Sequence, residues 1–257
     1  MPLVEITDPA DSRLADFRDL TDADVRPDHR GIVIVEGLTA VSRLLTSSYR
    51  VRAVVGVPSR LAQLSTVDAP VYSVDKWLLS DVVGFRVTRG VLAAADRPVP
   101  VPPSALLADA RRVAVLETLN DFENLGALFR NAAAFGVDAV LLDPQCADPL
   151  YRRSVRVSMG HVLHVPFAVL PDWLGGLKSL RDSGFSILAM TPRADAVPLR
   201  DVGPPPKWAV MLGAEGPGLT ADAMAAADTL VRIPMTGDVD SLNVATAAAI
   251  AFAHLVD

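Results

Sequence analysis

Apolar and polar positions alternate along the chain in two periods, and together these predict an α/β protein. Short apolar runs, typical of buried strands, recur between stretches in which the apolar positions have helical spacing. In the first part of the chain we expect strands over 31–37, 51–57 and 91–95, and helices over 37–47 and 74–82. This part therefore predicts a small α/β unit.

The alternation is stronger after residue 105, where it predicts a mostly parallel sheet with helices on both faces. We expect strands over 112–119, 138–143, 161–167, 185–190, 207–213 and 229–235, and helices over 124–135, 171–183 and 241–255. Residues 97–104 hold four prolines in eight positions, which favours extended backbone. The pattern therefore predicts two domains, 1–105 and 106–257, joined by a linker over 97–104.

Composition indicates a globular protein with a sizeable core, because 51% of the 257 residues are hydrophobic and 21% are charged. No apolar run reaches the ~18 residues of a membrane-spanning helix. The first residues lack the basic start and apolar stretch of a secretory signal. One cysteine, Cys146, can form neither an internal disulfide nor a thiolate metal cluster, and the four histidines show no ligand spacing. We expect a cytoplasmic protein with no membrane segment and no metal.

The net charge of −6 argues, as a total, against a nucleic-acid partner. The charge is unevenly distributed, however: residues 1–28 carry −5, residues 29–105 carry +4, and residues 106–257 carry −5. Residues 1–25 form an acidic extension, and only three of the 24 basic residues are lysine. The arginine-rich middle segment is thus suited to phosphate groups.

Three loops rich in glycine and polar residues follow predicted strands, which is where open α/β sheets bind ligands. They cover residues 120–126, 213–218 and 233–243. Each has a structural explanation when taken alone: Asn124 or Ser241 can cap a helix, and Arg130 can be a surface charge. Their glycine spacing fits neither the dinucleotide-binding fingerprint nor a P-loop.

Taken together, the loops resemble the three signature motifs of the SpoU–TrmH family, which are RNA ribose 2′-O-methyltransferases. The second motif matches residues 213–219 and the third matches 233–245, while residues 158–160 with 165–166 resemble a further family segment. The first motif matches Asn124, Gly126, Arg130, Ala132, Phe135 and Gly136. The resemblance extends from about Arg26 to the end and is looser before the proline run.

This resemblance implies a fold, a cofactor and partners. Residues 106–257 would form a trefoil-knotted methyltransferase domain with a parallel sheet. Two copies of the chain would form a homodimer through this domain. Residues 1–105 would form a small α/β RNA-binding domain similar to certain ribosomal proteins. The cofactor would be S-adenosylmethionine, and no metal is implied.

The resemblance also assigns roles to individual residues. Cofactor binding falls to Leu212, Gly213, Glu215, Gly216, Ile233, Met235 and Leu242, and we expect Thr191, which follows a predicted strand, to line the same pocket. Catalysis falls to Asn124, Arg130, Ser241 and Asn243, and the RNA contacts that we expect are Arg26, Arg30, Arg43 and Arg52.

Arg130 is the residue that we expect to carry catalysis. The family assigns its motif arginine to activating the 2′-hydroxyl, sometimes as the general base. A free arginine has a pKa above about 12 and is a poor base near neutrality, which favours gripping a phosphate and stabilising the developing alkoxide. Asn124 would position Arg130 or the ribose, Ser241 and Asn243 would fix a loop or bind the substrate, and Glu215 would organise the loops.

The separate RNA-binding domain favours ribosomal RNA as the substrate, with transfer RNA as the alternative. Two other functions remain open: a non-catalytic RNA-binding protein that retains the fold, and a methyltransferase for small molecules. The sequence leaves open which nucleotide is modified and which arginines contact RNA.

Overall fold

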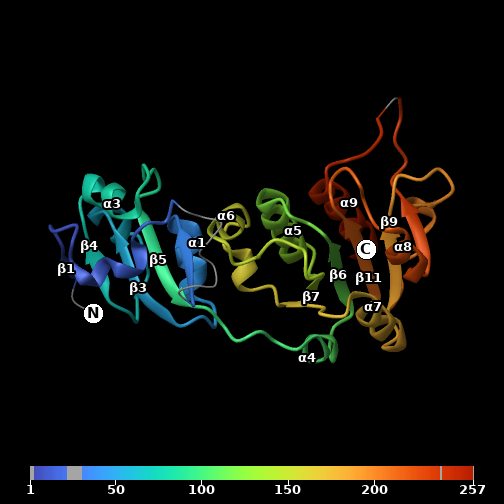
Figure 1. Cartoon of the computed structure of the whole chain (residues 1–257), viewed down its shortest axis with the longest axis horizontal. Helices are drawn as coiled ribbons and strands as arrows, with labels where there is room; N and C mark the ends of the chain where they lie inside the picture. Colours follow the sequence, from blue (N-terminus) through green and yellow to red (C-terminus); the bar gives the residue numbers. More distant parts are fainter. Residues whose placement is uncertain (1–2, 22–30, 238, 257) are drawn as a thin grey trace. The chain divides into compact units, whose positions relative to one another are not determined.

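The computed structural model of the chain describes residues 3–21, 31–237 and 239–256. Residue contacts divide the chain into two units (Figure 1). The N-terminal unit comprises Met1–Val99 and Asp148–His164, and the C-terminal unit comprises Pro100–Ala147 and Val165–Asp257. This division differs from the predicted domains 1–105 and 106–257 in two respects. The first boundary lies after Val99, and residues 148–164, which were expected in the second domain, pack with the first.

The N-terminal unit is built on a mixed sheet in the order β1-β4-β3-β5-β2, in which β5 runs antiparallel to both of its neighbours. Its strands are β1 (Leu3–Glu5), β2 (Ile32–Glu36), β3 (Val51–Gly56), β4 (Val71–Ser73) and β5 (Val91–Asp96). Its helices are η1 (Ser12–Phe17), α1 (Leu38–Leu45), α2 (Pro58–Leu61), α3 (Lys76–Val83), α6 (Arg152–Val157) and η3 (His161–Leu163). The short strands β1 and β4 were not predicted, because three residues give too little periodicity.

One face of this sheet packs on η1 and α3, with Ile34, Val55 and Leu92 in the shared core. Helix α3 begins where the Asp75 carboxylate accepts hydrogen bonds from the backbone N–H groups of the next turn, and it ends at Gly84 with a φ of +81°. The face of α3 that packs on the sheet consists of Leu78, Leu79, Val82 and Val83.

Ion pairs attach the segment Asp148–His164 to the rest of the N-terminal unit. Glu36, at the end of β2, is only 3% exposed, and its Oε2 lies 3.1 Å from Arg152 Nη1 and 3.8 Å from Arg156 Nη1. Arg97 donates two hydrogen bonds of 2.8 Å to the two carboxylate oxygens of Asp148. Charge-assisted bonds of this kind are stronger than neutral ones and fix geometry.

The C-terminal unit is built on an all-parallel sheet in the order β10-β12-β9-β11-β6-β7-β8. Its strands are β6 (Arg112–Glu117), β7 (Ala139–Leu142), β8 (Phe167–Val169), β9 (Ser186–Met190), β10 (Val197–Pro198), β11 (Trp208–Gly213) and β12 (Thr229–Arg232). Its helices are α4 (Pro103–Leu107), α5 (Phe122–Ala134), α7 (Trp173–Asp182), η4 (Leu199–Asp201), α8 (Ala221–Ala226) and α9 (Val244–Val256). The α/β class is confirmed, while the trefoil knot stays a prediction.

Helices cover both faces of this sheet (Figure 1). Val115 and Met211 share a core with residues of α4, α7 and α8. On the other face, Trp208 stacks on Phe252 of α9 with ring centroids 6.0 Å apart. Helix α5 packs beside α9 and carries Phe129. None of the helices in the described ranges is long and apolar enough to cross a membrane.

The strand predicted over 161–167 is wrong. Residues His161–Leu163 form one 3-10 turn, and strand β8 begins only at Phe167. The cause lies at Gly160, where the backbone turns with a φ of +85° and a Cβ would lie 3.1 Å from the Cα of Ala40 in α1. This close approach bends the chain where the apolar pattern alone indicates extension.

The buried carboxylate of Glu36 gives a stability prediction. Replacing Glu36 with alanine leaves two arginines without their partner, and we expect a loss of about 3 kcal/mol in the free energy of unfolding. Urea unfolding followed by circular dichroism measures this loss. The control Arg50→Ala removes a more exposed pair with Asp96 and should cost at most about 1 kcal/mol. Equal losses in the two variants would contradict the assignment.

Candidate functional site

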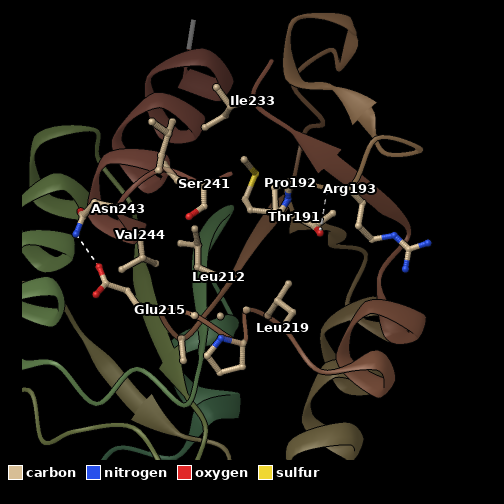
Figure 2. A pocket seen from close by; sticks show the side chains of 18 of the residues that line it. Thr191, Pro192, Arg193, Leu212, Glu215, Leu219, Ile233, Ser241, Asn243 and Val244 are labelled. Atoms are coloured by element: carbon tan, nitrogen blue, oxygen red, sulfur yellow. Dashed lines mark hydrogen bonds between the residues drawn. The ribbon is translucent and has the colours of Figure 1, made fainter. Parts of the chain in front are cut away.

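A cavity of about 700 Å³ opens in the C-terminal unit at the carboxyl ends of β9, β11 and β12 (Figure 2). Its walls come from the segments that follow these strands and from the segment that leads into α9. All eight residues predicted to bind the cofactor line it: Thr191, Leu212, Gly213, Glu215, Gly216, Ile233, Met235 and Leu242. Ser241 and Asn243 line it as well.

The loop after β11 folds back on itself and depends on glycine. Ala214 and Gly218 pair as an antiparallel bridge, in which the Gly218 N–H donates to the Ala214 carbonyl at 3.0 Å. A Cβ at Gly213 would lie 2.3 Å from the carbonyl carbon of Gly218, so no side chain fits there. Gly216 and Gly218 have φ values of +86° and +71°, where glycine avoids strain.

The side-chain amide of Asn243 connects the three loops. Its Nδ2 donates to Asn124 Oδ1 at 2.7 Å and to Glu215 Oε1 at 2.8 Å. Its Oδ1 accepts from the backbone N–H groups of Ala245 and Thr246, at 3.0 and 3.2 Å, in the first turn of α9. Because the oxygen caps the helix, both N–H groups must point toward the other two loops.

Asn124 does not cap its own helix, α5. That role belongs to Asp121, whose Oδ1 accepts from the backbone N–H groups of Glu123 and Asn124. The Asn124 side chain accepts a hydrogen bond from Asn243. About two turns further along α5, the Asn131 side chain donates to the Ala245 carbonyl at 2.8 Å. Two asparagines of α5 thus fix the start of α9.

Sequence reasoning missed Glu117, which is 4% exposed at the end of β6. Its Oε1 accepts from Thr220 Oγ1 at 2.7 Å and from Trp173 Nε1 at 3.0 Å, and its Oε2 accepts from the Thr220 N–H at 2.7 Å. These bonds hold the far end of the glycine-rich loop. The available signal was one acid directly after the four apolar residues 113–116, since a carboxylate buried in a strand needs hydrogen-bond partners.

Arg130 lies on the exposed side of α5 and is not among the cavity-lining residues in the described part of the chain. The arginine that does line the cavity is Arg193, which forms an ion pair of 2.7 Å with Asp195 and lowers the pKa of that carboxyl. In Figure 2, Arg193 lies on one side of the cavity, and Asn243 with Glu215 lies on the other. The predicted catalytic set is thus divided, with Asn124, Ser241 and Asn243 at or beside the cavity and Arg130 outside it.

The predicted RNA-contacting arginines have other partners where the structure describes them. Arg43 donates to the Met159 carbonyl, and Arg52 lies 3.0 Å from Asp16 and 3.8 Å from Asp96. Arg26 and Arg30 lie outside the described residues.

Cys146 contributes no nucleophile to this region. Its Sγ lies 3.3 Å from the Leu116 carbonyl, and burial raises the pKa of the thiol to about 12. Over residues 3–21, 31–237 and 239–256, no group of three or more His, Cys, Asp or Glu side chains could hold a metal ion.

The sequence model of the SpoU rRNA Methylase family matches residues 111–253, which include the whole cavity wall. The chain belongs to this family. The match covers more than half of the chain. As a member of this family, the protein is an RNA methyltransferase.

Similar proteins cover both units. An uncharacterised tRNA/rRNA methyltransferase of Mycobacterium tuberculosis is 51% identical over 96% of this chain and 90% of its own length. The 23S rRNA (guanosine(2553)-2′-O)-methyltransferase of Bacillus subtilis is 33% identical over 60% of this chain and 61% of its own. The solved structure of an AdoMet-bound rRNA methyltransferase from Sinorhizobium meliloti has a TM-score of 0.79 and 24% identity, covering 98% and 97% of the two chains, and shows the same fold.

The bonds of Asn243 lead to a prediction that separates its two roles. Asn243→Ala loses the helix cap and both loop contacts, so we expect unfolding to become about 1–2 kcal/mol easier. Asn243→Asp keeps the capping oxygen and should lose less stability, but its carboxylate faces that of Glu215. Hydrogen exchange of the amides in 213–219 should accelerate in both variants. Unchanged exchange there would show that Asn243 does not hold this loop.

Proposed function

We propose that the protein transfers the methyl group of S-adenosylmethionine to a ribose 2′-hydroxyl of RNA, with ribosomal RNA as the substrate and transfer RNA as the alternative. The observation that carries the proposal is the cavity that all eight predicted cofactor-binding residues line. Two of the three predicted loops, 213–218 and 233–243, contribute to its wall, and the third is joined to it by the hydrogen bond between Asn124 and Asn243. The name of the Bacillus subtilis relative supports the 2′-oxygen of ribosomal RNA, and the AdoMet-bound Sinorhizobium meliloti structure supports the cofactor.

The residues of the cavity fit S-adenosylmethionine. Gly216 and Gly218 line the cavity, and a Cβ at either would meet no heavy atom within 4 Å, so open space lies where side chains would otherwise stand. Leu212, Ile233 and Leu242 offer an apolar slot for an adenine ring, and the glycine-rich backbone allows close hydrogen bonding. When bound, the cofactor supplies a methyl group on a positively charged sulfur.

The loops give the site its rigidity. Asn243 holds Glu215 and Asn124 at hydrogen-bond distance, and Glu117 holds the loop from the other end through Thr220. A cavity whose walls are fixed before binding loses less entropy when it orients two reactants. Glu215 thus acts as an organiser of the loops, and Ser241 is left at the cavity wall to face the substrate.

Arg130 has the positive charge that the reaction needs, but within one chain it does not line the cavity. As a permanent cation it can bind an RNA phosphate and stabilise negative charge developing on the 2′-oxygen. Since it lies on the exposed side of α5 outside the cavity lining, a second copy of the chain would have to supply it. The proposal therefore includes a homodimer through the C-terminal unit, with each cavity completed by Arg130 of the other copy.

The role of Arg130 has a direct test. We expect Arg130→Ala to reduce methyl transfer to ribosomal RNA at least about 100-fold, because a charge-stabilising donor is lost. Its affinity for S-adenosylmethionine, measured by calorimetry, should stay within about twofold, since Arg130 does not line the cavity. Arg200→Ala is the control, because Arg200 is a similarly exposed arginine of the same unit. Wild-type turnover in Arg130→Ala would overturn the assignment.

Mixed dimers test whether the site is shared. Leu242→Trp fills the cavity, and calorimetry should show that it no longer binds the cofactor. Neither Leu242→Trp nor Arg130→Ala should be active alone. An equal mixture should regain about a quarter of wild-type activity, because half of the dimers have one complete site. No recovery after subunit exchange would place Arg130 and the cavity of the same chain together.

A further inference from the structure

A second hollow, of about 800 Å³, lies in the N-terminal unit around α3 and the turn that follows it. Trp77 lines it from the first turn of α3 and is 86% exposed, whereas Trp208 in the other unit is 2% exposed. The hollow is also lined by Lys76, Ser80, Asp81, Gly84, Phe85 and Arg86.

The indole of Trp77 does not pack into the core of the N-terminal unit. Helix α3 buries Leu78, Leu79, Val82 and Val83 against the sheet, and Trp77 lies off that face. Among the described residues, no ring or cation packs on Trp77, whereas Phe85 beside it carries the Arg152 guanidinium at 4.3 Å. Phe85 is thus part of the packing, and Trp77 presents a large aromatic surface to solvent.

The cations beside Trp77 are not used by the fold either. Neither Lys76 nor Arg86 makes an ion pair within the part of the chain that the structure describes. Many arginines of the same unit do have carboxylate partners: Arg13, Arg50, Arg52, Arg97, Arg152 and Arg156. Lys76 and Arg86 are both exposed, and Asp81 is the one acid lining the hollow.

We propose that this hollow binds an unpaired nucleotide of the RNA substrate. The base stacks on Trp77, and Lys76 and Arg86 hold the phosphates on its two sides. Stacking on an exposed aromatic ring flanked by basic residues is a physical basis for binding single-stranded RNA. Gly84, with a φ of +81°, forms the turn after α3 at the edge of the hollow, where a Cβ would lie 3.1 Å from Thr21 Cγ2.

A second copy of the chain is the competing occupant, and the composition of the hollow disfavours it. The centres of protein–protein interfaces are depleted of lysine and aspartate, and Lys76 and Asp81 both line this hollow. The site rests on the proposed RNA substrate, and it lies in the unit that does not hold the cofactor cavity.

The test uses the full chain and a labelled nine-nucleotide oligouridine, with anisotropy as the readout. We expect Trp77→Leu to weaken binding about 5- to 100-fold and Trp77→Phe, which keeps a ring, to weaken it about threefold or less. An abasic strand of the same length keeps the phosphates but offers no base, so wild type and Trp77→Leu should bind it equally. Oligouridine binding by Trp77→Leu that equals wild type would overturn the proposal.

The two cations have a separate readout. Removing both in Lys76→Ala/Arg86→Ala should flatten the dependence of log affinity on log salt by about 0.7 for each cation. Arg50→Ala is the matched control, because Arg50 is also exposed but is paired with Asp96, and its slope should equal that of wild type. A double variant with the wild-type slope would contradict phosphate binding at this site.

Two further outcomes separate this site from its alternatives. A change in oligomeric state in Trp77→Leu, by sedimentation, with unchanged RNA affinity would assign the surface to a protein contact instead. If wild type methylates RNA while Trp77→Leu binds oligouridine normally, only the nucleotide site fails. If Trp77→Leu loses oligouridine affinity while wild type transfers no methyl group, the proposed function fails and the nucleotide site stands.

Discussion

The geometry of the candidate site depends on one side chain, the amide of Asn243. Its oxygen is committed to the first turn of α9, so its two N–H groups must face Asn124 and Glu215. These residues belong to loops far apart in the sequence, and a parallel sheet brings them to one edge because its strands all end there. The sheet supplies proximity, and Asn243 fixes the loops relative to one another. The glycines of 213–218 then let the backbone close the cavity wall.

A second constraint is the placement of charge in the N-terminal unit. The net charge of −6 is a poor guide to RNA binding, because a total does not tell which arginines are paired with carboxylates and which cations are left without such partners. Arg97 and Arg152 bind Asp148 and Glu36, which attaches residues 148–164 to this unit. Removing the residues before the proline run would therefore leave residues 148–164 without Glu36, the partner of Arg152. Cations without carboxylate partners are the ones available to phosphates, and two of them flank Trp77.

The main strands and the long helices of both units could be predicted from periodicity, and every residue assigned to the cofactor by motif lies at the cavity. Other features depend on tertiary contacts that a linear pattern does not contain. Gly160 turns the chain because it packs against α1, so the apolar run that follows it is not a strand. Glu117 lies in a strand, as predicted, but its partners Thr220 and Trp173 come from distant parts of the chain, which the strand pattern does not contain. The position of Arg130 outside the cavity could not be predicted from motif spacing. The spacing predicts that Arg130 lies on a helix, but not which part of the protein its side chain faces.

The chemical identity of the methyl acceptor is the central claim, and one measurement tests it directly. The wild-type protein is incubated with S-adenosylmethionine carrying a radiolabelled methyl group and with ribosomal RNA from a strain that lacks the protein. The RNA is then hydrolysed in alkali, which cannot cleave next to a methylated 2′-oxygen. We predict that the label appears in alkali-resistant dinucleotides. Label in mononucleotides would show base methylation, and unlabelled RNA would show that ribosomal RNA is not the substrate; either result would contradict the assignment.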